Sequence, residues 1–124
     1  MATARKFEDL EVWSNSRDLV KKIYRATVCE PARCDLAFCG QIRRAAVRVM
    51  SNIAEGFGRY SDKEFARYLD IARGSLMETQ SLLYVAVDIE YIDTDTFRQL
   101  TEASSKLVAQ LTTFGQYLRN TGAA

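Results

Sequence analysis

The chain has 124 residues, of which 48% are hydrophobic and 27% charged, and this size and composition suit one globular domain with one core. With 17 basic and 16 acidic residues the net charge is +1, which excludes a protein held on nucleic acid or lipid by its overall charge. A single proline and six glycines leave few residues for turns, so we expect a small number of long elements.

The N-terminal segment gives no sign of export or of membrane insertion. Met1 to Leu10 lacks the hydrophobic core of a signal peptide, and no apolar run in the chain approaches the roughly 20 residues of a membrane span. We therefore expect a cytoplasmic protein without a membrane partner.

The first two predicted elements are helices, over residues 9–27 and 36–57. The first shows helical periodicity, with one side, expected to face the core, formed by Trp13, Ser16, Val20, Ile23, Tyr24 and Thr27, and with Leu10 and Leu19 at its margins. It is predicted to end in "VCEPARCD", where Pro31 biases the preceding residue away from the helical region. The second is predicted to begin at Asp35 or Leu36 and to end at the two glycines of "GFGRYS".

The other two predicted helices cover residues 62–90 and 96–118. Ser61 and Glu64 form a capping box at the start of the third helix, and Asp93 or Asp95 is expected to cap the fourth. All four elements have helical period and are joined by short connections. The sequence therefore predicts an all-α fold, a single antiparallel up-down-up-down four-helix bundle spanning residues 1–124.

One face of the second helix carries a polar stripe. Its members share a narrow sector opposite the apolar face: Gln41, Arg44, Arg48, Asn52, Glu55 and Arg59. A solvated helix face is one interpretation. The other is a set of half-buried, geometrically defined hydrogen bonds, since every basic residue of the stripe is arginine and none is lysine.

The third helix shows features of a second packing surface. Gly74 lies in mid-helix, where glycine costs about 1 kcal/mol relative to alanine, and would let another helix approach closely. Phe57, Tyr60 and Met77 have no evident place in the core of one monomer. We therefore predict a subunit interface at these four residues.

The sequence offers little for catalysis or metal binding. It contains no histidine, so a general base near neutral pH would need a strongly shifted pKa on another group. The thiols Cys29, Cys34 and Cys39 form no CxxC pair and lack a fourth zinc ligand. We expect no enzyme, no catalytic residue, no metal, no cofactor, no disulfide and no small-molecule substrate.

Four ordered motifs identify a resemblance that spans residues 7–118. These are "FEDLEVW", "QIRRAAV", "SNIAEGFGR" and "ARGSL", and with them the chain resembles the four-helix-bundle proteins encoded by intervening sequences of bacterial large-subunit rRNA genes. That family is similar in fold to the accessory protein of diversity-generating retroelements, a pentameric barrel that works with a reverse transcriptase and nucleic acid. The resemblance implies a homopentameric helical ring without catalysis. The signature polar positions that it implies are Gln41, Arg43, Arg44, Asn52, Glu55, Arg59, Arg73 and Glu78.

Two functions remain open at this point. The first is a non-catalytic oligomeric scaffold or adaptor that binds a protein partner. The second is a ring that binds RNA or DNA, linked to rRNA intervening sequences or to a reverse transcriptase, through arginines repeated around its axis. Residues 41–59 carry four arginines and one glutamate. We expect the stripe to be chiefly structural, with its arginines paired to Glu55, Glu78 or their equivalents within or between subunits, because burying unpaired charge is prohibitive.

Overall fold

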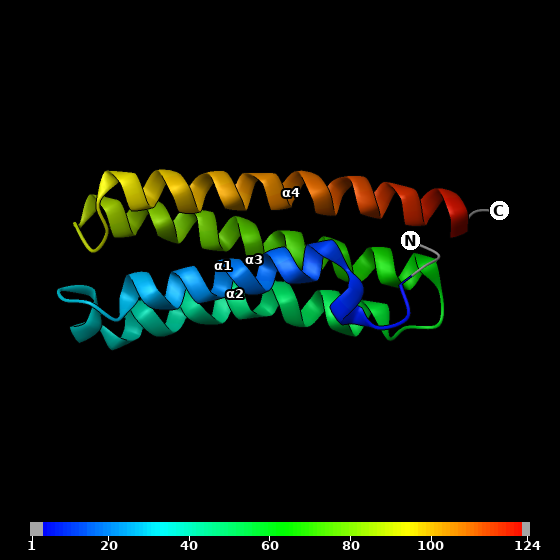
Figure 1. The fold of residues 1–124 in the computed structure, drawn as a ribbon, viewed down its shortest axis with the longest axis horizontal. Coiled ribbons are helices and arrows are strands. Elements are labelled where there is room, and N and C mark those ends of the chain that lie inside the picture. The colour runs from blue at the N-terminus through cyan, green and yellow to red at the C-terminus, as the bar shows by residue number, and fades with distance from the viewer. Residues whose placement is uncertain (1–3, 123–124) are drawn as a thin grey trace.

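The computed structural model describes residues 4–122 and confirms a four-helix bundle. The long helices are α1 (Glu11–Thr27), α2 (Leu36–Phe57), α3 (Asp62–Asp88) and α4 (Thr94–Gly122). Two short 3-10 helices, η1 (Phe7–Asp9) and η2 (Ala32–Cys34), precede α1 and α2. Neighbours in sequence pack side by side, α4 closes the bundle against α1, and the direction alternates from helix to helix (Figure 1). Residues 4–122 contain no strand.

Ser61 and Asp93 cap α3 and α4 as the sequence predicts, and Asp35, one of two predicted starts of the second helix, is the cap of α2. The side chains of Asp35, Ser61 and Asp93 accept hydrogen bonds from the backbone N–H three residues ahead, at 3.0, 3.1 and 2.7 Å. Each bond satisfies one of the N–H groups that a helix start leaves free. Of the two candidates for the start of α4, Asp93 is the cap.

The predicted end of the third helix is wrong by two residues, because Glu90 stops it. Glu90 has a φ of 62°, in the left-handed region, and a helix cannot continue through it. Its N–H donates to the Val87 carbonyl at 3.1 Å, and the N–H of Tyr91 donates to the Ala86 carbonyl at 2.8 Å. This pair of bonds is the Schellman motif, in which glycine usually takes the left-handed position. Glutamate gives no such signal in the sequence.

The glycine pair of "GFGRYS" has a different role from the one predicted. Only Gly58 lies at the end of α2, whereas Gly56 is buried inside it. A Cβ on Gly56 would lie 2.7 Å from the Tyr68 Cβ and 2.8 Å from the Phe65 Cδ1. Gly56 therefore permits the close approach of α2 and α3.

The core is mainly apolar, with large fully buried side chains from all four helices: Leu19, Ile23, Ile42, Val49, Ile53, Leu69, Leu76, Leu83, Leu107 and Leu111. One expectation for α1 is wrong. Tyr24, predicted to point inward, is 41% exposed, and Leu19, at the margin of the predicted face, is buried in its place. None of the helices in the described part of the chain combines the length and apolarity that a membrane crossing requires.

Candidate functional site

The polar stripe on α2 is tied to α3 by one ion pair. Arg48 Nη2 lies 2.6 Å from Glu78 Oε1, and both side chains are about half exposed. The Asn52 amide donates to the Arg48 carbonyl at 2.8 Å, one turn back along α2. The predicted pairing of a stripe arginine with Glu78 is therefore formed within a single chain.

Two further arginines take tyrosines rather than carboxylates as partners. The Arg43 guanidinium lies 4.7 Å from the centroid of the Tyr24 ring, and its Nε donates to Thr27 Oγ1 at 2.9 Å. Arg59 lies 4.7 Å from the centroid of the Tyr68 ring and donates to its hydroxyl. Both contacts are cation–π pairs, which combine electrostatic attraction with contact area.

The remaining signature residues differ in whether their side chains form hydrogen bonds or ion pairs. Arg73 Nη1 donates to Thr112 Oγ1 at 3.1 Å and so links α3 to α4. Within residues 4–122, Gln41, Arg44 and Glu55 take part in no side-chain hydrogen bond or ion pair, so the predicted pairing with Glu55 is not formed there.

The four predicted interface residues are not equivalent in the structure. Phe57 belongs to the monomer core, because its ring packs edge-on against the buried Phe65 with centroids 6.0 Å apart, and placing it outside the core was wrong. Tyr60 is fully exposed, and Met77 is 45% exposed. A Cβ on Gly74 would meet no atom of residues 4–122 within 4 Å, so none of the four described helices packs closely on it.

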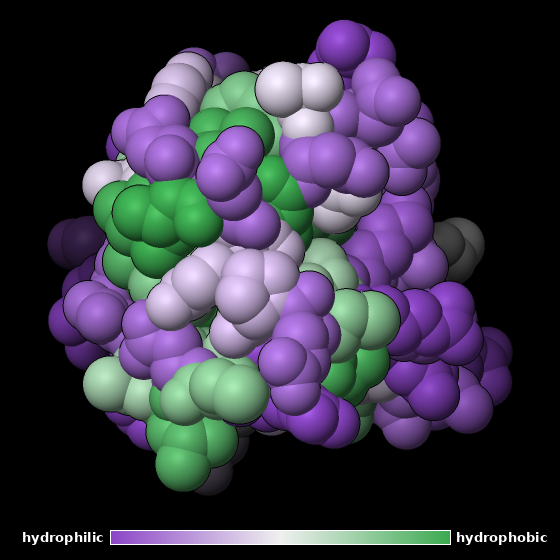
Figure 2. Space-filling model, turned by 90° about the vertical axis from the view of Figure 1, so that its left-hand side faces the viewer, coloured by the Kyte–Doolittle hydropathy of each residue, from purple (hydrophilic) through white to green (hydrophobic). Residues whose placement is uncertain are grey.

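Sequence reasoning missed other exposed apolar residues. On α3 they are Ile71, Tyr84 and Val85, which lie on the same outer side as Gly74. The end of the bundle that holds the α1–α2 connection and the α3–α4 turn shows separate apolar patches among polar residues (Figure 2). The exposed apolar residues of these connections include Val28 and Ile89.

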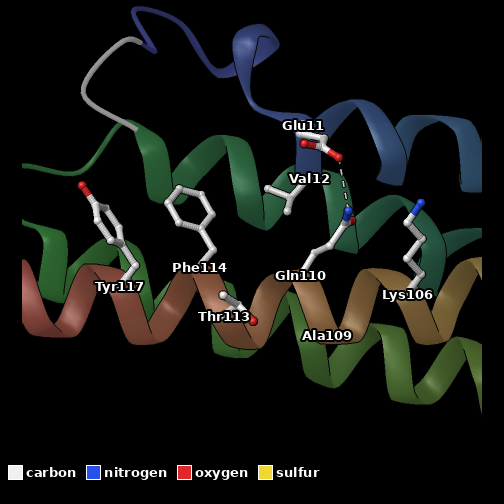
Figure 3. Close-up of a pocket in the computed structure, with 8 residues that line it drawn as sticks. All are labelled: Glu11, Val12, Lys106, Ala109, Gln110, Thr113, Phe114 and Tyr117. Atoms are coloured by element: carbon white, nitrogen blue, oxygen red, sulfur yellow. Dashed lines mark hydrogen bonds between the residues drawn. The ribbon is translucent and has the colours of Figure 1, made fainter.

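A groove between α1 and α4 was not predicted either. It has a volume of 570 Å³, with Val12, Phe114 and Tyr117 pointing into it (Figure 3). Gln110 Nε2 donates to Glu11 Oε1 at 3.3 Å across the seam. The groove lies where α4 continues past the start of α1 (Figure 1), so the last turns of α4 have no α1 residue opposite them.

The shifted pKa values have structural causes. The Tyr91 hydroxyl donates to Asp35 Oδ2 at 2.7 Å, which lowers the pKa of Asp35 and raises that of Tyr91. The backbone N–H of Thr96 lowers the pKa of the Asp93 carboxyl in the same way. These groups stabilise helix starts and do not form a reactive cluster.

The three cysteines lie in different environments. Cys29 and Cys34 are exposed, whereas Cys39 is buried, with its Sγ 3.1 Å from the Ala32 carbonyl oxygen. The described residues contain no group of three or more cysteine, aspartate or glutamate side chains arranged to hold a metal ion.

Comparison with known proteins identifies the family. A model of the 23S rRNA-intervening sequence proteins matches residues 8–113. The chain belongs to this family. The predicted resemblance to rRNA intervening-sequence proteins is thereby confirmed, while the relation to retroelement accessory proteins stays a prediction.

A solved structure supports the fold of this intervening-sequence protein. A protein of unknown function from the S23 ribosomal protein family of Bacteroides thetaiotaomicron superposes with a TM-score of 0.75 at 24% sequence identity, covering 82% of this chain and 95% of the other. At this identity the likeness concerns the fold alone. No curated protein matches the chain.

Proposed function

We propose that this intervening-sequence protein is a non-catalytic oligomeric scaffold, whose copies assemble through the outer face of α3 into a ring that binds a protein partner. The observation that carries the proposal is the open surface at Gly74. A glycine in the middle of a 27-residue helix weakens that helix by about 1 kcal/mol, and, outside its own turn of the helix, no atom of residues 4–122 lies within 4 Å of where its Cβ would be.

The residues around Gly74 have the pattern of a helix-packing seam. Gly74 and Ser81 are seven residues apart and form a line of small residues along α3. Exposed apolar side chains flank this line, Ile71 and Val85 on one side and Met77 on the other. Small residues at heptad spacing between larger apolar ones let a second helix approach closely, so a neighbouring subunit fits this face.

The chemistry of the chain also favours binding over catalysis. The sequence contains no histidine, and the resolved pKa shifts belong to hydrogen-bonded helix caps and their partner Tyr91. A general acid or base near neutral pH would have to come from a group that none of these shifts involves.

The alternative function, a ring that binds RNA or DNA through the stripe, has weaker support. It needs arginines whose charge is available to phosphate. Arg48 is paired with Glu78, and Arg59 is held on Tyr68, so the stripe offers less free charge than the sequence suggests. The scaffold is the function that the geometry supports better.

Light scattering after size-exclusion chromatography tests the proposal. We expect a mass several times the 14.0 kDa of one chain, with five copies favoured by the family resemblance. Gly74→Leu should dissociate the assembly while circular dichroism shows intact helices. Gln116→Leu, which places the same side chain on an exposed position of α4, is the matched control and should leave the mass unchanged. A monomeric wild type, or assembly unaffected by Gly74→Leu, would contradict the proposal.

A further inference from the structure

We propose that the outer face of α1 and α2 binds single-stranded nucleic acid. This cationic face is defined by Arg17, Lys21, Tyr24, Arg25, Arg43 and Arg44. It shares only Arg44 with the polar stripe, and it needs neither the ring nor the α3 interface.

The first argument is the excess of cations that carry no acidic partner. Residues 11–57 hold eight lysines and arginines against five acids. Three of the cations are in ion pairs: Lys22 with Asp18, Arg33 with Glu30, and Arg48 with Glu78. The other five form no ion pair with any residue of 4–122, and all five belong to the cationic face.

Two of the acids at the starts of α1 and α2 have partners outside the cationic face. Glu11 accepts a hydrogen bond from Gln110 on the α4 side, and Asp35 accepts from Tyr91 and from the backbone of α2. A local excess of negative charge lies at the α3–α4 turn, where residues 88–95 include four acids and no lysine or arginine.

The second argument is the arrangement of the cations on two adjacent helices. Arg17, Lys21 and Arg25 follow one another at intervals of four residues, so they share one side of α1. The contact of Arg43 with Tyr24 brings the start of α2 against this side. Arg44 follows directly, and its guanidinium lies over Gly40, since a Cβ there would be 3.0 Å from Arg44 Nη1.

The third argument is the aromatic surface between the cations, which favours a single strand over a duplex. Tyr24 is 41% exposed and carries Arg43 on its ring, while Arg17 lies 5.7 Å from the centroid of the Trp13 ring. Thr27 fixes the Nε edge of Arg43, so the guanidinium plane is held in place before any ligand arrives. Unstacked bases stack on aromatic rings and on guanidinium planes, while phosphates pair with the surrounding cations.

Fluorescence anisotropy with a labelled single-stranded RNA of about 12 nucleotides tests the proposal at about 50 mM salt and above. The variant Lys21→Gln/Arg25→Gln/Arg44→Gln should bind about tenfold more weakly, and the slope of log K against log salt should become shallower by about 2, as three lost phosphate contacts imply. The control Lys63→Gln/Arg98→Gln/Lys106→Gln removes the same charge from α3 and α4 and should bind as the wild type does. Circular dichroism verifies the fold of both.

The role of stacking is tested separately. Tyr24→Ala should weaken RNA binding about fivefold or more, whereas Tyr24→Phe keeps the ring and should retain affinity. The single strand should bind more tightly than a duplex of the same sequence. Absence of wild-type binding, equal losses in the two triple variants, an unaffected Tyr24→Ala, or a preference for the duplex would each overturn the proposal. None of these outcomes bears on the oligomeric mass, so this proposal and the scaffold can fail independently.

Discussion

Arg48 and Glu78 join α2 to α3 through a contact of 2.6 Å between Nη2 and Oε1. Their side chains are 48% and 41% exposed, so solvent screens the pair, and its contribution is at most about 1 kcal/mol. We predict that Arg48→Ala and Glu78→Ala each lower the free energy of unfolding by up to about 1 kcal/mol, with a coupling of about 0.2–1 kcal/mol in a double-mutant cycle. Urea denaturation measures all four proteins.

Arg44→Ala is the matched control for Arg48→Ala, because Arg44 lies one turn away on the same face and has no ion-pair partner among residues 4–122. Its unfolding free energy should stay within about 0.5 kcal/mol of the wild type. Equal losses in Arg44→Ala and Arg48→Ala would show that the ion pair is not what stabilises this part of α2.

Two glycines in adjacent helices should respond oppositely to alanine. A Cβ at Gly56 would overlap Tyr68 Cβ at 2.7 Å, whereas a Cβ at Gly74 would meet nothing within 4 Å. We predict that Gly56→Ala lowers the unfolding free energy by about 1–3 kcal/mol through overpacking. Gly74→Ala should raise it by about 0.5–1 kcal/mol through helix propensity, as measured by denaturation at a concentration where the chain is monomeric. The same sign for both substitutions would contradict the close packing of Gly56 against α3.

The backbone conformation of Glu90 is unfavourable for a residue with a Cβ, and glycine would adopt it without this penalty. Its φ of 62° is costly for a residue with a Cβ, by about 1–2 kcal/mol. Glu90→Gly should therefore stabilise the protein by about 1 kcal/mol relative to Glu90→Ala, which removes the same carboxylate but keeps the Cβ. Thermal unfolding of the two variants measures the difference. Identical melting temperatures would mean that the left-handed position is not strained.

Helix starts and the apolar periodicity could be predicted because both are local properties of the sequence. Asp35, Ser61 and Asp93 each hold a backbone N–H only three residues ahead, and this spacing is visible without any structure. The end of α3 could not be predicted from such signals, since glutamate is an uncommon choice for a left-handed residue.

The partners of the candidate site depend on how the helices are placed relative to one another. The sequence groups Arg43, Arg48 and Arg59 as similar cations, but Tyr24, Glu78 and Tyr68 meet them only after packing. Helical periodicity assigns a residue to a face only to within about one position. Because Tyr24 lies next to the inward face of α1, the periodicity places it in the core, although it is exposed. The same uncertainty concealed the cationic face, because no local pattern shows which cations of α1 and α2 lie together.

The contact between Asp35 and Tyr91 joins the start of α2 to the α3–α4 turn and should make stability depend on pH. The Tyr91 hydroxyl, and then the Phe38 N–H, lower the pKa of Asp35 from its ordinary value of 3.8. A lowered pKa in the folded state means that the stabilisation is present above 3.8 and is lost as the pH falls through the lower folded value. The pKa of Tyr91 is raised from 10.0, chiefly by the same bond, so this part of the stabilisation is present below 10.0 and is lost as the pH rises through the higher folded value.

We predict that Tyr91→Phe, which keeps the ring edge-on to Phe38, is less stable than the wild type near neutral pH, and that the difference in unfolding free energy shrinks at both extremes of pH. Urea denaturation from about pH 2 to pH 11 spans both ordinary pKa values and measures this difference. Tyr84→Phe is the control, because Tyr84 also packs edge-on against a phenylalanine, Phe97, but its hydroxyl bonds no carboxylate among residues 4–122. A Tyr91→Phe difference that does not change with pH, or one that Tyr84→Phe reproduces, would show that the hydroxyl–carboxylate bond does not stabilise the fold.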